Sequence, residues 1–259
     1  MSYDFGSREF VDAYDELPLW SAAFGLLLFQ HVPLRANTIA LDVGCGTGFP
    51  LLELAQRLGP GSAVHGLDPW APALLRANRK RRQWQITNAQ LHLGTAAAMP
   101  FRTGAFDLVV SNLGVNNFDD PAASLAECRR VLRPAGTLAL TTNLVGHMRE
   151  LYEVLASLVG DDSALRAHIE KRATVDKLQT LLGQSGFTVQ RAIEQTFTMR
   201  YATGSALLGH AFIQFGFLPG WQAAVPEGDR TRVFAELERR LNAIAPLTLT
   251  IPCAYVEAT

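Results

Sequence analysis

The chain has 259 residues, which is enough for one large domain or two small ones. Hydrophobic residues make up 48% of it and charged residues 18%, so it can bury a sizeable core and wholesale disorder is excluded. With 23 Lys and Arg against 24 Asp and Glu, the formal net charge of −1 gives no overall attraction to nucleic acid or to an anionic membrane, and a small partner of mixed polarity fits better.

Residues 1–36 are predicted to be helical and amphipathic. Their most apolar stretch, residues 17–29, contains Pro18 and follows an acidic start, whereas an export signal needs positive charge there. This stretch is also too short to span a membrane. The three cysteines are too few and too widely separated for a disulfide framework or a paired-cysteine zinc site. We therefore predict a cytoplasmic protein without an export signal or a membrane span.

Short β-rich segments alternate with helical ones from Thr38 onward. The predicted strands are residues 39–43, 63–67, 90–93, 106–111 and 137–142. The predicted helices between them are residues 50–58, 70–83 and 121–132, and residues 133–136 break the chain before the fifth strand. Strands joined by helical crossovers predict an α/β fold with a doubly wound, mostly parallel sheet.

Strict alternation ends after the fifth strand. Helices are expected around 147–159 and 175–185, a sixth strand at 187–193 and a seventh at 247–256, where Pro252 indicates an edge or a bulge. The predicted division is an N-terminal helical lid at 1–36, a cofactor-binding core at 37–199, a helical insertion over the substrate site at 200–245 and a final edge strand at 246–259.

A glycine-rich loop, residues 44–48, follows the first predicted strand. Its glycines allow positive φ and a close backbone approach, and the next helix N-terminus offers unpaired N–H groups to an anion. Twenty residues past Gly48, Asp68 ends the second predicted strand, where a carboxylate can accept two hydrogen bonds from a ribose. Ligands of open parallel sheets bind at this edge, so the pair indicates an adenosine-containing cofactor.

The spacing of the glycines distinguishes between cofactors. A dinucleotide fingerprint needs glycine at position 49, where Phe49 stands, and no phosphate loop of the G-x-x-x-x-G-K-[ST] type occurs. A nicotinamide-dependent oxidoreductase is therefore the less favoured alternative.

Five motifs occur in order along the chain: Leu41–Gly48, Gly66–Asp68, Met99–Phe101, Phe106–Val109 and Leu132–Leu138. Together they resemble the class I S-adenosylmethionine-dependent methyltransferases, and more narrowly the small-molecule group that includes the ubiquinone and menaquinone biosynthesis methyltransferases. The resemblance covers about residues 10–193. It implies a Rossmann-like methyltransferase fold with seven strands, and S-adenosylmethionine as the methyl donor.

The resemblance also implies a cofactor site on the loops that follow the first four predicted strands, with an N-terminal tyrosine closing over it. Its expected members are Asp42, Gly44, Cys45, Gly46, Asp68, Pro69, Trp70, Thr95, Ala96, Asn112, Leu113 and Tyr14. Asp42 is expected near the ammonium group and Asp68 on the ribose hydroxyls. Thr95 and Ala96 are expected to flank the adenine, although the family often carries Asp at one of these positions to accept from the adenine amino group.

Of the same set, Cys45 and its glycine neighbours are expected to contact the methionine portion through their backbone. Trp70 is expected beside the adenosine, with a helix-start packing role as the alternative. Asn112 and Leu113 are expected close to the sulfonium. The Asn-Pro-Pro-aromatic motif that the family uses on planar nitrogens is missing, which argues against a nucleic-acid or protein-glutamine target.

The predicted acceptor is a small, partly apolar metabolite, methylated by in-line displacement that depends mainly on proximity and orientation. His210 and His147 are the candidate general bases, with ordinary packed histidines as the alternative. Leu208, Phe212 and Phe215 follow helical spacing, which indicates either a core-facing helix side or the wall of a substrate chamber.

Three further expectations concern other kinds of partner. No clustered metal-ligand spacing occurs, so no metal site is predicted. The basic run at 76–82 is predicted to be a solvated helix face rather than an RNA contact. A nonenzymatic protein that only binds the cofactor or a partner remains an alternative, because cofactor motifs alone do not establish catalysis. The sequence does not indicate an oligomeric state.

Overall fold

The computed structural model describes residues 4–17, 19–244 and 246–259, which form two compact units. The first unit combines the residues up to 142 with 175–194 and 254–259. The second combines 143–174 with 195–253, so residues 200–245, which were predicted as an insertion, share a unit with the segment that follows the fifth strand. None of the described helices is long and apolar enough to cross a membrane.

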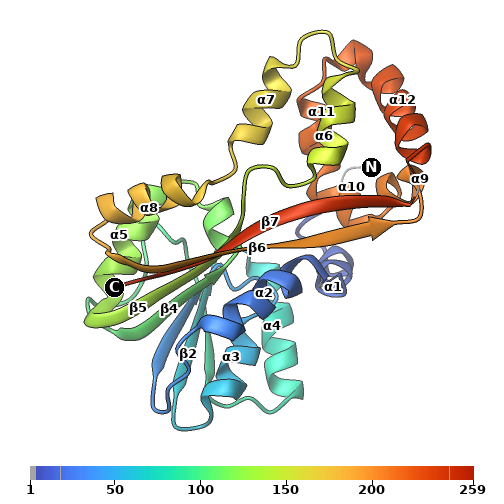
Figure 1. The fold of residues 1–259 in the computed structure, drawn as a ribbon. Helices are drawn as coiled ribbons and strands as arrows, with labels where there is room; N and C mark the ends of the chain where they lie inside the picture. The colour runs from blue at the N-terminus through green and yellow to red at the C-terminus, as the bar shows by residue number, and fades with distance from the viewer. Residues whose placement is uncertain (1–3, 18, 245) are drawn as a thin grey trace. The chain divides into compact units, whose positions relative to one another are not determined.

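Seven strands form one sheet in the order β3-β2-β1-β4-β5-β7-β6 (Figure 1). Their bounds are β1 (Ile39–Val43), β2 (Ala63–Asp68), β3 (Ala89–Leu93), β4 (Phe106–Asn112), β5 (Leu132–Asn143), β6 (Val189–Tyr201) and β7 (Leu247–Ala258). Strands β1 to β5 pair in parallel. Thr188 and Thr259 exchange backbone hydrogen bonds of 2.8 and 3.0 Å, which joins the start of β6 to the end of β7 in antiparallel fashion. This mostly parallel sheet with flanking helices confirms the predicted α/β fold.

Strand β5 begins five residues earlier than predicted, at Leu132 instead of Thr137. Leu132 pairs with Phe106 and Thr137 pairs with Leu108, so residues 133–136 form an irregularity within the strand pairing. The predicted break is therefore present as a shift of register. Proline and glycine in this segment fit such an irregularity, because neither favours a regular strand.

The prediction that the final strand is an edge strand is wrong. Strand β7 lies between β5 and β6, and β6 is the edge. Pro252 is tolerated because β5 has already ended at Asn143: the next residue, Leu144, donates its backbone N–H to the Pro252 carbonyl at 2.9 Å. At this position β7 has to supply a hydrogen-bond acceptor and not a donor. The missing N–H of Pro252 therefore removes no hydrogen bond on the side of β7 that faces β5.

The helices of the first unit pack on the sheet and on one another. They are α1 (Arg8–Asp15), α2 (Leu19–His31), α3 (Leu51–Leu58), α4 (Ala71–Gln83), the short 3-10 helix η1 (Gly114–Asn117), α5 (Pro121–Val131) and α8 (Val175–Gln184). Helix α3 contacts β2, α4 contacts β3, and α5 contacts α8 (Figure 1). Helix α2 buries Phe24, Leu27 and Leu28, yet it also exposes Leu19 and Leu26, so it is apolar on more than one side rather than amphipathic.

The second unit contains the remaining described helices. They are α6 (Arg149–Ala156), α7 (Ser163–Glu170), α9 (Gly204–Leu208), α10 (Ala211–Gly216), α11 (Leu218–Ala223), the 3-10 helix η2 (Glu227–Asp229) and α12 (Arg230–Asn242). The predicted apolar stripe of Leu208, Phe212 and Phe215 does not lie on one helix, because the chain breaks between α9 and α10 at Gly209 and His210. Trp221 is fully buried in this region, as are Leu207 and Ile213.

Candidate functional site

A cavity of about 370 Å³ in the first unit lies at the carboxyl ends of the parallel strands. Loops after β1, β2, β3 and β4 line it, as does one residue of α1. Of the residues predicted for the cofactor site, those that line it are Tyr14, Gly44, Gly46, Asp68, Pro69, Trp70, Thr95 and Ala96. This is the strand edge at which open parallel sheets bind ligands.

The cavity also contains residues that the sequence analysis missed. They belong mostly to the loop between η1 and α5 and include Asn117, Phe118, Asp119 and Asp120. Asp120 is already occupied as the N-cap of α5, where its carboxylate accepts from the Ala123 N–H at 3.0 Å. An Asp-Asp pair immediately before Pro121 was the available sequence signal, because it follows the fourth strand at the same sheet edge.

The glycine loop after β1 depends on backbone conformations that other residues rarely adopt. Gly44 has φ +81°, and a Cβ there would lie 3.1 Å from the Gly114 Cα. Gly48 has φ +103°, and a Cβ there would lie 3.1 Å from both Leu52 and Ala77. Glycine is therefore required at both positions, at Gly44 by the neighbouring loop and at Gly48 by α3 and α4.

Asp68 links the first two loops of the site. Its Oδ2 accepts from the Gly46 N–H at 2.8 Å, and its Oδ1 accepts from the Trp70 N–H at 2.8 Å. Burial raises the pKa of this carboxyl, while the two backbone N–H groups oppose that shift. Each carboxylate oxygen can accept a further hydrogen bond, so Asp68 can hold both loops and still receive the two hydroxyls of a ribose.

Asp42 is a buried carboxylate without a cationic partner among the described residues. It lies on β1 two residues before Gly44, is 0% exposed, and neither of its oxygens makes a hydrogen bond of ordinary geometry. Burial and then the charge of Asp68 raise its pKa to about 8, and the Leu51 N–H only partly opposes this. A buried acid in this state is stabilised by a cationic partner. The ammonium group that the resemblance places here fits that need.

Four predicted site residues lie outside the lining of this cavity: Asp42, described above, and Cys45, Asn112 and Leu113. Cys45 is buried, and its Sγ lies only 2.8 Å from where a Cβ on Gly66 would stand, so its side chain packs against β2. The Asn112 side chain donates to the Ser21 carbonyl of α2 at 3.1 Å and accepts from Thr141 at 2.7 Å. Leu113 has φ +65° and is buried. Their contacts with a cofactor stay predictions.

Aromatic residues bring the N-terminal segment to the cavity. The Trp70 indole N–H donates to the Phe5 carbonyl at 2.8 Å, and the Tyr14 ring meets the Trp70 ring edge-on with centroids 5.3 Å apart. Burial, followed by the charges of Asp68 and Asp15, raises the pKa of the Tyr14 phenol. Tyr14 therefore stays protonated and can donate a hydrogen bond beside Asp68.

Ion pairs hold α1 on α4. Asp15 contacts Arg76 at 2.8 Å and Lys80 at 2.5 Å, and Asp12 contacts Arg79 at 2.5 Å. The prediction that the basic run is a solvated face is wrong for these three cations, because two acidic residues of α1 cover them. The Asp15 side chain is only 9% exposed, and Lys80, Thr47 and Arg76 lower its pKa by hydrogen bonding despite its burial.

The two candidate bases belong to the second unit. His147 is 1% exposed, neither ring nitrogen has a partner, and burial, together with the charges of Arg172 and His168, lowers its pKa to about 3. His210 is half-buried, with its ring 5.7 Å from that of Tyr201 and its Nδ1 unpartnered. The general-base roles stay predictions. Among the described residues no group of three His, Cys, Asp or Glu is arranged to hold a metal ion.

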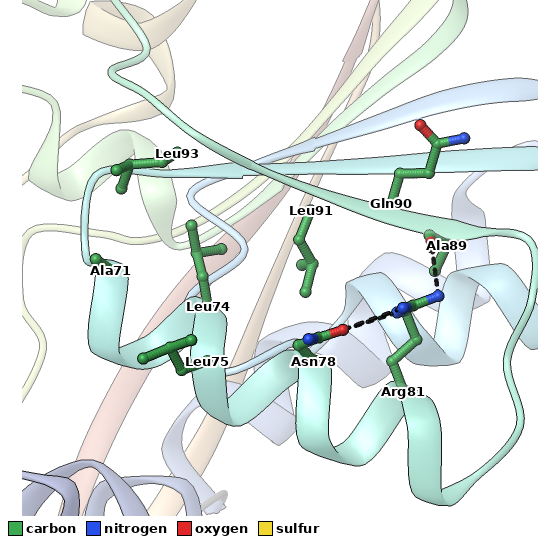
Figure 2. A pocket seen from close by; sticks show the side chains of 9 residues that line it. All are labelled: Ala71, Leu74, Leu75, Asn78, Arg81, Ala89, Gln90, Leu91 and Leu93. Carbon is green, nitrogen blue, oxygen red and sulfur yellow. Dashed lines mark hydrogen bonds between the residues drawn. The ribbon is translucent and has the colours of Figure 1, made fainter.

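A second pocket, of about 550 Å³, lies between α4 and the edge strand β3 (Figure 2). Its walls are mainly aliphatic, with Leu74, Leu75 and Leu91 facing into it. Arg81 crosses one end and donates to the Asn78 Oδ1 at 3.1 Å and to the Ala89 carbonyl at 3.4 Å. This pocket contains none of the predicted site residues, so we place the candidate site in the smaller cavity.

The raised pKa of Asp42 predicts how stability changes with pH. Its pKa is about 8 in the folded chain against an ordinary value of 3.8, so between about pH 4 and 8 the folded state keeps a proton that the unfolded state releases. Stability should therefore fall as pH rises through this window, by up to about 1.4 kcal/mol per pH unit from this group. Asp42→Asn should remove that component in urea unfolding measured from pH 5 to 9.

The control for this measurement is Asp176→Asn, which changes an exposed carboxylate on α8. The control should keep the slope of the unmodified protein. Parallel stability curves for Asp42→Asn and the unmodified protein would contradict the assignment of a protonated buried acid.

The comparisons with known proteins identify the family of the chain. Residues 41–140 match the family described as a methyltransferase domain. The chain is 30% identical over 247 residues to nocamycin O-methyltransferase of Saccharothrix syringae, an alignment that covers 88% of each protein. It is 39% identical over 109 residues to a demethylmenaquinone methyltransferase of Lactiplantibacillus plantarum, which covers 42% of this chain and 46% of that one.

A crystal structure of an S-adenosylmethionine-dependent methyltransferase from Aquifex aeolicus has the same fold, with a TM-score of 0.57 at 17% identity over 74% of this chain and 93% of that one. The similarity to the first relative extends through nearly the whole chain, beyond the cofactor motifs. It therefore favours an enzyme over both alternatives, the nicotinamide-dependent oxidoreductase and the nonenzymatic binding protein. The chain belongs to the class I S-adenosylmethionine-dependent methyltransferases.

Proposed function

We propose that this methyltransferase acts on an oxygen atom of a small, partly apolar metabolite and that its cofactor occupies the 370 Å³ cavity of the first unit. The observation that carries the cofactor's placement is the unpartnered carboxylate of Asp42, which a cationic amino acid portion would neutralise. Oxygen as the acceptor atom is supported by the relative aligned over 88% of this chain, an O-methyltransferase. A cytoplasmic location remains a prediction from the sequence.

The proposed binding roles follow the geometry of the cavity. The Gly44 and Gly46 backbone lies at the methionine portion, with Asp42 toward its ammonium group. Asp68 accepts the ribose hydroxyls with the lone pairs that the two loops leave free. The adenosine portion contacts a set of residues from the loops after β2 and β3, namely Pro69, Trp70, Thr95 and Ala96.

Two further groups of residues complete the proposed site. Tyr14 covers the cavity from α1 and donates its phenol hydrogen. Asn112, Leu113 and Cys45 support the loops from behind through the contacts described above. Neither Thr95 nor Ala96 is acidic, so the adenine amino group needs a hydrogen-bond acceptor from another residue. Asp119 lines the same cavity and can supply that acceptor.

S-adenosylmethionine, when bound, supplies a methyl group on a sulfonium that is already a good leaving group. The protein's own contribution is then to hold the acceptor oxygen in line and to exclude water. A general base adds to the rate only if the oxygen arrives protonated. With its pKa lowered to about 3, His147 is a poor base near pH 7, which leaves His210 as the candidate if one is needed.

The proposal is tested by incubating the protein with S-adenosylmethionine labelled in the methyl group and a metabolite extract. We expect label in a small product whose mass rises by one methyl group, and mild base or fragmentation then shows whether oxygen carries it. Label on a nitrogen or carbon atom would contradict the acceptor assignment. Label that enters protein or nucleic acid instead would contradict the small-molecule assignment.

Asp68→Ala should weaken the binding of S-adenosylhomocysteine by about 1 to 3 kcal/mol, the cost of leaving hydrogen-bonding groups without their partners. Isothermal titration calorimetry measures this directly. The matched control is Asp176→Ala on α8, which should leave the affinity unchanged. Equal affinities for Asp68→Ala and the unmodified protein would remove the ribose assignment.

Asp15→Asn should speed the release of S-adenosylhomocysteine by about tenfold, because it breaks the ion pairs with Arg76 and Lys80 that hold Tyr14 at the cavity. Asp12→Asn is the control: it breaks pairs at the same helix interface but at a more exposed side chain. Stopped-flow measurement should show a smaller change for Asp12→Asn. Equal rates for the two variants would mean that α1 acts only through general packing.

A further inference from the structure

The α4–β3 groove, which is the second pocket described above, lies beside an open edge of the sheet (Figure 2). Strand β3 pairs with β2 on one side and has no strand on its other side in the described sheet. The Asn88 carbonyl accepts from the Val64 N–H at 2.8 Å, and the Gly94 N–H donates to the Asp68 carbonyl at 3.2 Å. Because the two strands pair in regular parallel register, the even-numbered residues from 88 to 94 direct their backbone groups toward β2.

The odd-numbered residues of β3 therefore direct their backbone N–H and C=O groups away from β2. They are Ala89, Leu91 and Leu93. The Ala89 carbonyl accepts from Arg81 at 3.4 Å, whereas the backbone groups of Leu91 and Leu93 face the open side of the sheet. The strand contains neither lysine nor proline, which proteins often use to block such an edge. An open edge of this kind is a template for pairing with another chain.

The α4–β3 groove beside this edge is mainly aliphatic. Leu74 and Leu75 of α4 line one side of it, and Leu91 and Leu93 of β3 line the other. Leu75 is 68% exposed and Leu93 is 63% exposed, so apolar surface flanks the open edge. Side chains alternate along a strand, so every second side chain of a strand added to β3 would point into the groove. The groove therefore suits apolar side chains at alternate positions.

A cation lies across one end of the groove. The Arg81 Nε and Nη2 both donate to the Asn78 Oδ1 at 3.1 Å, and its Nη1 donates to the Ala89 carbonyl. A guanidinium has five N–H groups, so this one keeps donors for a ligand. Within the described part of the chain no carboxylate pairs with Arg81, although two acids of α1 pair with three other cations of the same helix. An acidic group is therefore the complement of this end of the groove.

We propose that the α4–β3 groove binds an extended, acidic peptide segment of a partner protein, which adds to β3 as an antiparallel strand. In this arrangement the segment forms hydrogen-bonded pairs with Leu91 and Leu93, and its C-terminal side lies at Ala89 beside Arg81. The segment is apolar at the two positions opposite the leucines and acidic at the position opposite Ala89. The groove shares no lining residue with the cofactor cavity, so the inference goes beyond the proposed function.

Two other occupants suit the groove less well. A fatty acid could place its carboxylate at Arg81, but its alkyl chain would cover the open backbone groups of Leu91 and Leu93 without hydrogen-bonding to them, which costs free energy. A second copy of this chain, paired antiparallel through its own β3, would bring Leu93 and not an acid to the position opposite Ala89. Strand β3 contains no acidic residue at all.

The first experiment measures, by fluorescence anisotropy on the full chain, the binding of a labelled pentapeptide amide with the sequence Leu-Thr-Val-Thr-Asp. We expect it to bind about two- to fivefold more tightly than the same peptide ending in Asn, the size of an exposed ion pair. Arg81→Gln should abolish this preference, and Arg81→Lys should retain part of it. Arg82→Gln is the matched control, because Arg82 is exposed on the same helix and does not line the groove.

A second pair of peptides tests the strand pairing itself. Methylation of the valine backbone nitrogen removes the N–H that would donate to the Leu91 carbonyl, and we expect binding to weaken about five- to tenfold. Methylation of the nitrogen of the threonine before it is the matched control. That N–H would point away from β3, so the control should have a smaller effect.

Three results would overturn the proposal: no peptide binding at millimolar concentration, equal affinities for the Asp and Asn peptides, or equal effects of the two methylations. Sedimentation that shows a dimer which Leu91→Arg dissociates would assign the edge to a second copy and would overturn it as well. Octanoate binding that Arg81→Gln abolishes, in the absence of peptide binding, would assign the groove to a fatty acid. Unchanged thermal unfolding of each variant shows that the chain remains folded.

Discussion

The carboxylate of Asp68 determines the shape of the candidate site. One oxygen accepts from the loop after β1 and the other from the loop after β2, so the two loops have one fixed separation. Asp68 holds Trp70, and the N-terminal segment packs on Trp70. The carboxylate therefore also determines the aromatic contacts of Trp70 and the position of Tyr14. If this carboxylate were removed, the part-buried backbone N–H groups of Gly46 and Trp70 would lose their acceptor.

The burial of Asp42, two residues before Gly44 on β1, comes at the expense of stability. A carboxyl with no partner in a fully buried position disfavours its own ionisation, and the charge of Asp68 adds to that. Buried groups of this kind are characteristic of functional sites, where a ligand rather than the protein completes the pairing.

Much of the first unit could be predicted from the sequence, because its signals are local. Glycines at 44 and 48, the apolar strand before them and Asp68 at the end of the next strand each specify a backbone conformation or a strand end. The role of Asp12 and Asp15 could not be predicted, since an ion pair between residues more than sixty positions apart has no sequence pattern. The same holds for Pro252, whose tolerance depends on where β5 stops.

The order of the strands has a consequence for synthesis on the ribosome. Strand β6 is made before β7, yet β7 is its only neighbour in the sheet and separates it from β5. Until residues 247–258 have emerged, β6 has no partner for its backbone groups and β5 has an open side. The nascent chain thus carries two unpaired strand edges while the residues between β6 and β7 are translated. It depends on rapid insertion of β7 to avoid pairing with other chains.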